Sequence, residues 1–227
     1  MLTTPFISII IPVLNEAGQI GALLQALRAL PAATEVIVVD GGSVDGTREW
    51  LAGQPDLCVL DAPRGRGQQL HTGASHATGE VLLFLHADCR LPDNAVDLLW
   101  RALQTPSIVG GAFVIQFAEA RPYSLSLIAK GINARTRVTR TATGDQGIFV
   151  RRAVYEAVGG FEAWPLFEDV RLVAKLKQKG KFAILPQPVT ISGRRYIANG
   201  PWLTLGLARG CSALTLMRSV LPRLRAI

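Results

Sequence analysis

The chain has 227 residues, of which 49% are hydrophobic and 18% charged, a composition that supports one substantial core and excludes two full-sized domains. The three cysteines, Cys58, Cys89 and Cys211, lie far apart without metal-ligand or redox spacing, which favours a reduced, cytoplasmic protein. The net charge is +7, and residues 170–227 contain 11 of the 24 basic residues and no acidic residue, so we expect an anionic partner: a phosphate group, a membrane surface or nucleic acid.

Strand and helix patterns alternate through the first half of the sequence. Residues 6–13, 35–40, 57–60 and 81–85 are predicted strands, and residues 17–30, 45–53, 67–77 and 92–103 are predicted helices. Ser43 or Asp45 is expected to cap the second helix, and Pro92 to lie in the first turn of the fourth. This alternation predicts an α/β fold with a Rossmann-like, mostly parallel sheet flanked by helices.

Polar and acidic side chains follow three of the predicted strands at the point where each strand ends. Ligands of such sheets bind outside the carboxyl ends of the strands, so these side chains are expected to share one edge. Each residue alone is explained by a helix cap or a turn, but three groups at successive strand ends favour a binding site. The set comprises Asn15 and Glu16, then Asp40, Gly41 and Gly42, and finally His86 and Asp88.

The second half of the sequence is less regular. Its predicted elements are a strand at 109–117, a basic helix at 123–139, a turn and strand at 144–150, a helix at 152–158, a helix at 168–178 after an aromatic-rich loop, two short strands and a terminal helix at 202–221. We expect no secretory leader in residues 1–5. We also expect no membrane-spanning helix, because Arg209 and Arg218 interrupt the apolar stretch near the end.

The segment GGSVDGT after Asp40 allows the backbone to turn tightly and to approach a ligand. It is neither a GxGxxG fingerprint nor a Walker loop, so a nicotinamide dehydrogenase is disfavoured. Arg64 and Arg66 precede a predicted helix, where arginines and free amides suit a diphosphate, although a solvated loop explains them as well. His71 and His76 are expected to be ordinary helix residues.

Two groups of carboxylates are candidates for chemistry. Asp88 offers the hard oxygen that Mg²⁺ or Mn²⁺ prefers when the ion also holds phosphates. Glu168 and Asp169 begin a predicted helix, where capping alone would explain them. A carboxylate on an aromatic-rich loop also suits a general base that takes a proton from an acceptor hydroxyl.

Five segments, in order along nearly the whole chain, resemble the family 2 glycosyltransferases of the GT-A fold. They are PVLNE (12–16), VVDGGSVDGT (38–47), RGRGQQLHTGASHATGEVLLFLHAD (64–88), GDQGIFVRR (144–152) and FEDVRL (167–172). The HAD sequence and SGRRY (192–196) are similar to a small bacterial subgroup of single-domain members. The resemblance implies one domain over 1–227, with a nucleotide-sugar-binding half (1–104), an irregular acceptor and catalytic half (105–200) and a C-terminal basic amphipathic helix (201–227).

The resemblance implies inverting transfer of a sugar from a nucleotide diphosphate donor, UDP-sugar by default, to an unidentified acceptor hydroxyl, with Mg²⁺ or Mn²⁺ as cofactor. It implies that Asp169 is the catalytic base, supported by Glu168, and that Asp88 binds the metal as the last residue of the DxD motif. His86 replaces the first acid of that motif, which leaves the identity of the nucleotide open. The implied donor-binding residues are Pro12, Asn15, Glu16, Asp40, Gly42, Arg66, His86, Gly144, Asp145, Gln146, Arg194 and Arg195.

Other functions fit parts of the pattern. Acids, a metal and arginines would also serve a nucleotidyl- or phosphotransferase, and His86 is compatible with a degenerate, non-catalytic nucleotide-sugar-binding module on a membrane. The basic tail predicts contact with anionic lipid on the inner face of the cell membrane, packing on the core or a dimer contact. We see no helix-turn-helix, zinc or RNA-binding motif, so nucleic acid is not expected.

Overall fold

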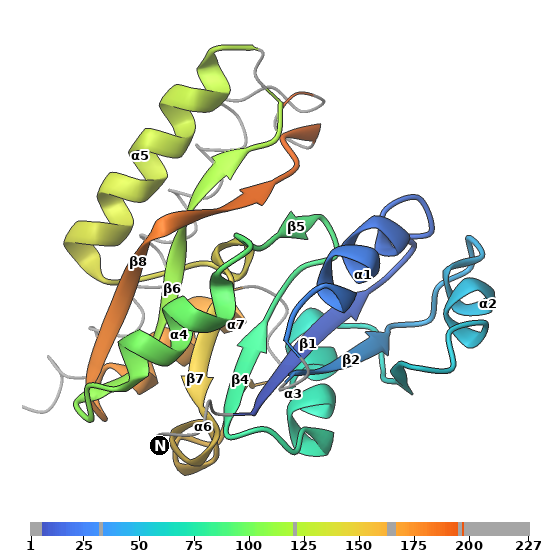
Figure 1. Cartoon of the computed structure of the whole chain (residues 1–227), viewed down its shortest axis with the longest axis horizontal. Helices are drawn as coiled ribbons and strands as arrows, with labels where there is room; N and C mark the ends of the chain where they lie inside the picture. The colour runs from blue at the N-terminus through green and yellow to red at the C-terminus, as the bar shows by residue number, and fades with distance from the viewer. Residues whose placement is uncertain (1–5, 32–33, 120–121, 163–166, 195–196, 198–227) are drawn as a thin grey trace, which may run out of the picture.

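The computed structural model describes residues 6–31, 34–119, 122–162, 167–194 and 197. In this part of the chain, eight strands form one sheet with the order β3-β2-β1-β4-β7-β6-β8-β5 (Figure 1). The strands are β1 (Ile7–Val13), β2 (Thr34–Asp40), β3 (Cys58–Asp61), β4 (Val81–Phe84), β5 (Cys89–Arg90), β6 (Ile108–Phe117), β7 (Ile148–Arg151) and β8 (Lys181–Ile191). The helices are α1 (Ile20–Arg28), α2 (Thr47–Ala52), α3 (Arg66–His76), α4 (Ala95–Leu103), α5 (Ser124–Thr139), the 3₁₀ turn η1 (Gly144–Gln146), α6 (Arg152–Ala157) and α7 (Glu168–Leu176).

The first half of the chain forms the parallel part of the sheet, in which β3, β2, β1 and β4 are neighbours. Alternate residues of β1 enter two different cores, because successive side chains of a strand point to opposite faces. Ile9 and Ile11 pack on the side of α1, α4 and α5, while Ile10 packs on the side of α3, α6 and α7. Burial on both faces explains the unbroken apolar sequence of β1.

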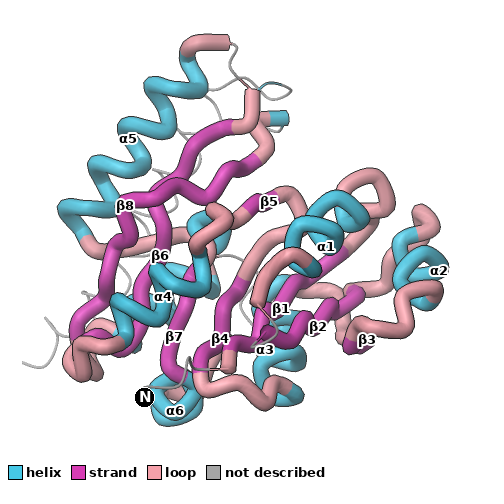
Figure 2. Tube along the Cα trace, viewed as in Figure 1, coloured by secondary structure: helices cyan, strands magenta, loops and turns pink. Residues whose placement is uncertain are grey.

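The second half of the chain makes the sheet mixed. Strand β7 is antiparallel to both β4 and β6, β6 is parallel to β8, and β5 is antiparallel to β8. Figure 2 shows β6 and β8 running together with α5 alongside. Four of the seven pairings between neighbouring strands in the described residues are parallel, so the predicted α/β fold with a mostly parallel sheet is confirmed.

The prediction of two short strands after α7 was wrong, because a single strand of 11 residues, β8, occupies this segment. Pro186 and Pro188 lie within this strand. In the structure Leu185 pairs with Phe113 and Pro188 with Val114, so the intervening residues form a bulge within one continuous strand. A bulge accommodates proline, which cannot donate to the ladder of hydrogen bonds.

Two predicted helix starts also differ from the structure. Gly46, with a φ of 91°, is the N-cap of α2 instead of Ser43 or Asp45. Pro92 precedes α4 and accepts a hydrogen bond from the amide of Ala95, so it lies outside the first turn.

Among the described residues no helix is long and apolar enough to cross a membrane. The expected C-terminal helix lies outside the described residues.

Candidate active site

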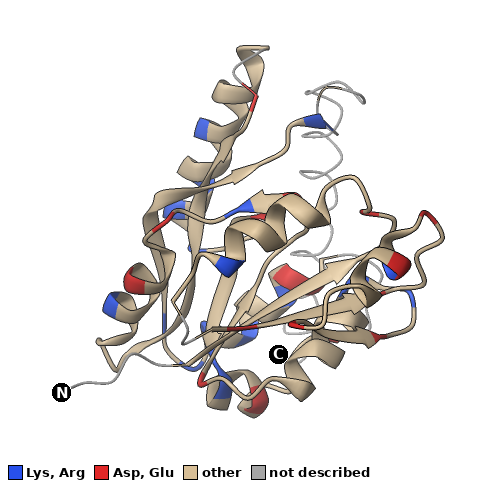
Figure 3. Cartoon of the chain, turned by 45° about the vertical axis from the view of Figure 1, so that its right-hand side comes forward, with Lys and Arg blue, Asp and Glu red and all other residues tan. Residues whose placement is uncertain are grey.

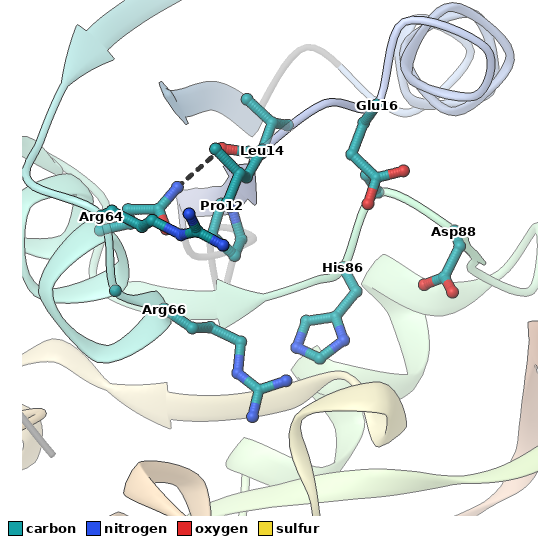
Figure 4. Close-up of a pocket in the computed structure, with 11 residues that line it drawn as sticks. Pro12, Leu14, Glu16, Arg64, Arg66, His86 and Asp88 are labelled. Atoms are coloured by element: carbon teal, nitrogen blue, oxygen red, sulfur yellow. Dashed lines mark hydrogen bonds between the residues drawn. The ribbon is translucent and has the colours of Figure 1, made fainter. Parts of the chain in front are cut away.

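A cavity of about 280 Å³ opens where β1 and β4 end and α3 begins. Figure 4 shows the cationic side chain of Arg66 next to the ring of His86, with the carboxylates of Glu16 and Asp88 on the far side of that ring. Three of the strand-end residues that the sequence predicted to converge, Glu16, His86 and Asp88, therefore line one cavity. The cavity is lined by Pro12, Val13, Leu14, Glu16, Arg64, Gly65, Arg66, Gln69, His86, Ala87 and Asp88.

Gln69 holds the ends of the two strands at this cavity, a role that the sequence analysis missed. The side chain lies on the buried face of α3, and its amide donates to the carbonyl oxygens of Val13 at 2.8 Å and of Val39 at 2.9 Å. Both carbonyls lie where β1 and β2 leave the sheet, so one side chain fixes both chain reversals. A polar residue among the apolar positions of α3 was the available sequence signal.

The loops after β1 and β2 are hydrogen-bonded to each other. Asn15 lies in the left-handed region with a φ of 57°; its amide donates to the Ser43 hydroxyl at 2.9 Å, and its side-chain oxygen accepts from the amide of Val44 at 2.9 Å. Two further bonds follow, because the amide of Glu16 donates to the hydroxyl of Thr47 and that of Ala17 to Asp45. The polar residues of GGSVDGT thus join two strand ends.

Asp40 is fully buried below these loops. Its carboxylate accepts hydrogen bonds from the amides of Gly42 and Ser43 and from the Ser43 hydroxyl. Gly42 has a φ of 92°, a conformation that favours glycine. Asp40, Asn15 and Gly42 do not line the cavity, and they shape the loops beside it.

The second carboxylate pair lies at the start of α7, as predicted, and both side chains are buried. Glu168 is 2% exposed and forms an ion pair with Arg66, 102 residues away in the sequence. The first turn of α3 lies directly on α7, since a methyl group added to Gly67 would come within 2.7 Å of the Glu162 carbonyl oxygen and 3.3 Å of the Glu168 side chain. Arg66 therefore joins the cavity to the carboxylate pair.

Asp169 is 5% exposed, and its two carboxylate oxygens accept hydrogen bonds from the amides of Gly144 and Val170, both at 2.7 Å. Burial raises the pKa of this carboxyl, and the adjacent charge of Glu168 raises it further. The charge of Arg66 and the two backbone amides oppose this increase in the pKa. The result is a buried carboxyl group whose proton affinity is higher than that of an ordinary aspartate.

Gly144 separates the ring of His86 from the carboxylate of Asp169. A methyl group on Gly144 would lie 2.6 Å from His86 Nε2 and 3.5 Å from Asp169 Oδ2. The ring and the carboxylate therefore face the same small space, which only glycine leaves open. This contact connects the end of β4 with η1 and α7.

The other two residues of the GDQ sequence differ in their placement. Gln146 is fully buried, and its side chain bonds to the carbonyl of Phe113 in β6 and to the hydroxyl of Thr136 in α5. It also forms a capping box with Thr143, so it points into the protein and fixes the turn. Asp145 is half-buried, and one of its carboxylate oxygens accepts from the Thr143 hydroxyl at 2.5 Å.

Of the two arginines predicted near the end of β8, Arg194 does not line the described cavity. Arg194 is exposed, and its backbone amide and guanidinium both donate to the hydroxyl of Ser192. Arg195 lies outside the described residues. The exposed Arg64, which stands beside Arg66 in the sequence, lines the cavity instead.

The side chains at this cavity fit a divalent cation that takes some of its ligands from the protein and the others from a bound substrate. No group of three histidine, cysteine or acidic side chains that could hold a metal alone occurs among the described residues. Asp88 does offer one carboxylate to the cavity, next to His86 and opposite the arginines (Figure 4). Mg²⁺ and Mn²⁺ commonly take one or two protein carboxylates and complete their coordination with phosphate oxygens and water.

The mixed sheet and the cavity at the carboxyl ends of its parallel strands define an α/β protein of the GT-A type. Residues 8–159 match the family described as Glycosyl transferase family 2. The chain belongs to this family, as the sequence motifs indicated.

Three similar proteins illustrate the range of the family. The chain is 32% identical over 180 residues to Glycosyltransferase AglE of Haloferax volcanii, covering 70% of this chain and 57% of AglE. It is 29% identical over 167 residues to an Undecaprenyl-phosphate 4-deoxy-4-formamido-L-arabinose transferase of Sodalis glossinidius, covering 66% of this chain and 50% of the relative. The matched part of the chain thus spans about half the length of these two relatives. The structure of Mannosyltransferase PcManGT from Pyrobaculum calidifontis, in complex with GDP-Man and Mn²⁺, matches with a TM-score of 0.59 and 26% identity over 84% of this chain and 58% of that one.

Proposed function

We propose that this protein is an inverting glycosyltransferase that moves a sugar from a nucleoside diphosphate donor to an acceptor hydroxyl. The observation that carries the proposal is the Arg66–Glu168 ion pair, which joins a cavity containing Asp88 and His86 to the buried carboxylate of Asp169. UDP-sugar remains the default donor, although the solved relative holds a GDP-sugar. Membership in the glycosyl transferase family disfavours the nucleotidyl- and phosphotransferase alternatives.

In the proposed mechanism Asp169 takes the proton from the acceptor hydroxyl as that oxygen attacks the anomeric carbon. The amides of Gly144 and Val170 fix the orientation of the carboxylate, and Arg66 neutralises the adjacent Glu168. Arg64 and Arg66, at the start of α3, stabilise the charge of the departing diphosphate. Asp88 would hold Mg²⁺ or Mn²⁺, which when bound supplies further positive charge to the diphosphate.

Thermal denaturation with a panel of UDP- and GDP-sugars tests this proposal. A donor that binds the folded state is expected to raise the melting temperature in the presence of Mn²⁺ or Mg²⁺. Asp88→Ala should abolish the metal-dependent part of this shift, whereas Asp93→Ala should not, because Asp93 is 98% exposed and lies outside the cavity. A flat response to every donor would contradict the proposed function, and release of a sugar 1-phosphate instead of a nucleoside diphosphate from the donor would favour a nucleotidyltransferase.

The pH dependence of transfer should follow the charges around Asp169. Its pKa is raised by burial and by Glu168 and is lowered by Arg66, so activity should be lost on acidification at a higher pH than an ordinary aspartate would give. Glu168→Gln removes the like charge and should move the acid limb of the kcat profile to lower pH. Arg66→Gln removes the opposing cation and should move it to higher pH. The profiles are measured at saturating donor, and Glu156→Gln, which alters an exposed carboxylate, serves as the control.

If Glu168→Gln and Arg66→Gln moved the acid limb of the profile in the same direction, this result would contradict the assignment of Asp169 as the titrating base. Equal profiles for all three variants would do the same, because neither charge would then act on the group that limits the rate.

A further inference from the structure

Helix α5 presents two apolar faces, of which one belongs to the core. Ile128, Ala129 and Ile132 are buried in the cluster that covers one side of the sheet, and Leu125 is buried as well. Asn133 fixes the helix to β6, since its side chain accepts from the amide of Ile115 at 2.8 Å and donates to the carbonyl of the same residue at 2.9 Å. These contacts leave the opposite side of α5 to the solvent.

The outer side of α5 carries an apolar stripe. Tyr123 is 76% exposed, Leu127 60% and Val138 84%. Positions 123, 127, 131, 134 and 138 are three or four residues apart, so they follow one another along a single side of a helix. Gly131 and Ala134 occupy the middle of this series and add no polar group. The outer stripe, defined as Tyr123, Leu127 and Val138, therefore lies along one side of the helix.

Cations flank the outer stripe on both sides. Lys130 and Arg137 are seven residues apart, two helical turns, and lie along one flank, while Arg135 lies on the other. Arg140 follows at the C-terminal end of the helix, and all four residues are exposed. Residues 120–144 contain no acidic residue. Figure 3 shows basic residues at several points along this helix.

We propose that the outer face of α5 is a docking surface for an anionic lipid bilayer. An apolar stripe between basic flanks is the pattern with which amphipathic helices lie on a membrane, with the stripe among the acyl chains and the cations at the headgroups. Charge complementarity favours a bilayer over two other occupants of this face, namely residues 198–227 of the same chain and a second copy of the protein. Residues 198–227 contain four arginines and no acid, and a second copy of the same face is equally basic, so both would bring like charges together.

The position of α5 connects this surface with the catalytic residues, and in this respect the inference rests on the proposed function. Thr136, on the inner side of the helix, bonds to Gln146, and the same turn contains Gly144, which donates to Asp169. A bilayer on the outer face would therefore lie one helix away from the base. An acceptor hydroxyl borne by a lipid would suit this arrangement.

Flotation of the full-length protein with vesicles tests the proposal directly. Vesicles that contain about 30% phosphatidylglycerol should carry the wild type, whereas pure phosphatidylcholine should not. Leu127→Ser with Val138→Ser removes the apolar contact, and Lys130→Gln with Arg137→Gln removes two charges. Each double variant is expected to bind anionic vesicles at least about tenfold more weakly, since each cation and each buried side chain contributes severalfold.

Matched controls alter equally exposed residues away from α5. Val44 is 89% exposed, and Arg101 and Lys179 are exposed cations on other elements. Val44→Ser and the double variant Arg101→Gln with Lys179→Gln should float like the wild type. Unchanged melting temperatures of all variants would establish that folding is intact, and donor-dependent thermal shifts, measured without vesicles, would report separately on the proposed function.

Four outcomes would overturn the proposal. The wild type could fail to float, or both α5 variants could float as well as the wild type. Light scattering could show a dimer that Leu127→Ser with Val138→Ser dissociates, which would make the outer stripe a contact between copies. Binding to duplex DNA that depends on Lys130 and Arg137 but not on Leu127 and Val138, without binding to vesicles, would assign the face to nucleic acid.

Discussion

Asp169→Asn is expected to lower the rate of sugar transfer about 1,000-fold while donor binding stays close to that of the wild type. General base catalysis contributes roughly 100- to 10,000-fold, and an amide cannot accept the proton of the acceptor. The carboxylate of Asp169 is bonded to the backbone and does not line the donor cavity, so the substitution should leave the donor contacts in place. Single-turnover transfer and the donor-dependent shift in melting temperature measure the two quantities separately.

The matched control for this variant is Asp97→Asn. Asp97 lies in the first turn of α4, as Asp169 does in α7, but it is exposed and does not line the cavity. Its replacement should change neither quantity. If Asp169→Asn retained full transfer, the base would have to be sought elsewhere.

Gly144→Ala should reduce transfer by at least about 100-fold, which is a large effect for a single methyl group. The added carbon would lie 2.6 Å from Nε2 of His86, closer than real contacts allow, and 3.5 Å from the carboxylate of Asp169. Either the ring or the turn must move, and displacement of a catalytic group by about 1 Å costs on the order of 100-fold in rate. Steady-state transfer and the melting temperature measure the effect on the site and on the fold.

Two further variants identify the cause. Gly131→Ala adds the same methyl group within α5, where nothing lies within 4 Å, and should stabilise the fold by about 0.5–1 kcal/mol without a change in rate. His86→Ala removes the ring with which the added methyl group collides. In the His86→Ala background, Gly144→Ala should therefore lower the rate of transfer by a smaller factor than it does in the wild type. Strict additivity of the two substitutions would show that the collision does not cause the defect.

Local patterns in the sequence predicted the parallel half of the sheet well. The apolar runs of β1, β2 and β4 are set by burial on both faces, and the residues that follow them lie at the carboxyl edge because the strands are parallel. The cavity contains three of these predicted residues, Glu16, His86 and Asp88, for this reason alone. The residue pattern also singled out Glu168 and Asp169, whose burial at the start of α7 the structure shows.

The contacts that determine how each side chain is used were not predictable from local patterns. Gln146 follows two residues assigned to the donor, yet its amide is turned into the core by Phe113 and Thr136, from elements that precede it in the chain. Gln69 bridges two strand ends 56 and 30 residues away. These hydrogen-bond partners depend on how α3 and α5 pack on the sheet. Hydrophobic periodicity predicts that a helix packs on the sheet, but not which residues then lie opposite each other.

The Arg66–Glu168 ion pair has a consequence for the order in which the protein is assembled. Its partners are 102 residues apart, and contacts of such sequence separation form only after the entropy of a long loop has been lost. Synthesis proceeds from the N-terminus, so the parallel half-sheet emerges with Arg66 still unpaired while α7 has not yet been made. The charge that we propose for the leaving group is thus in place early, and the carboxylate pair joins it only after α7 has been made.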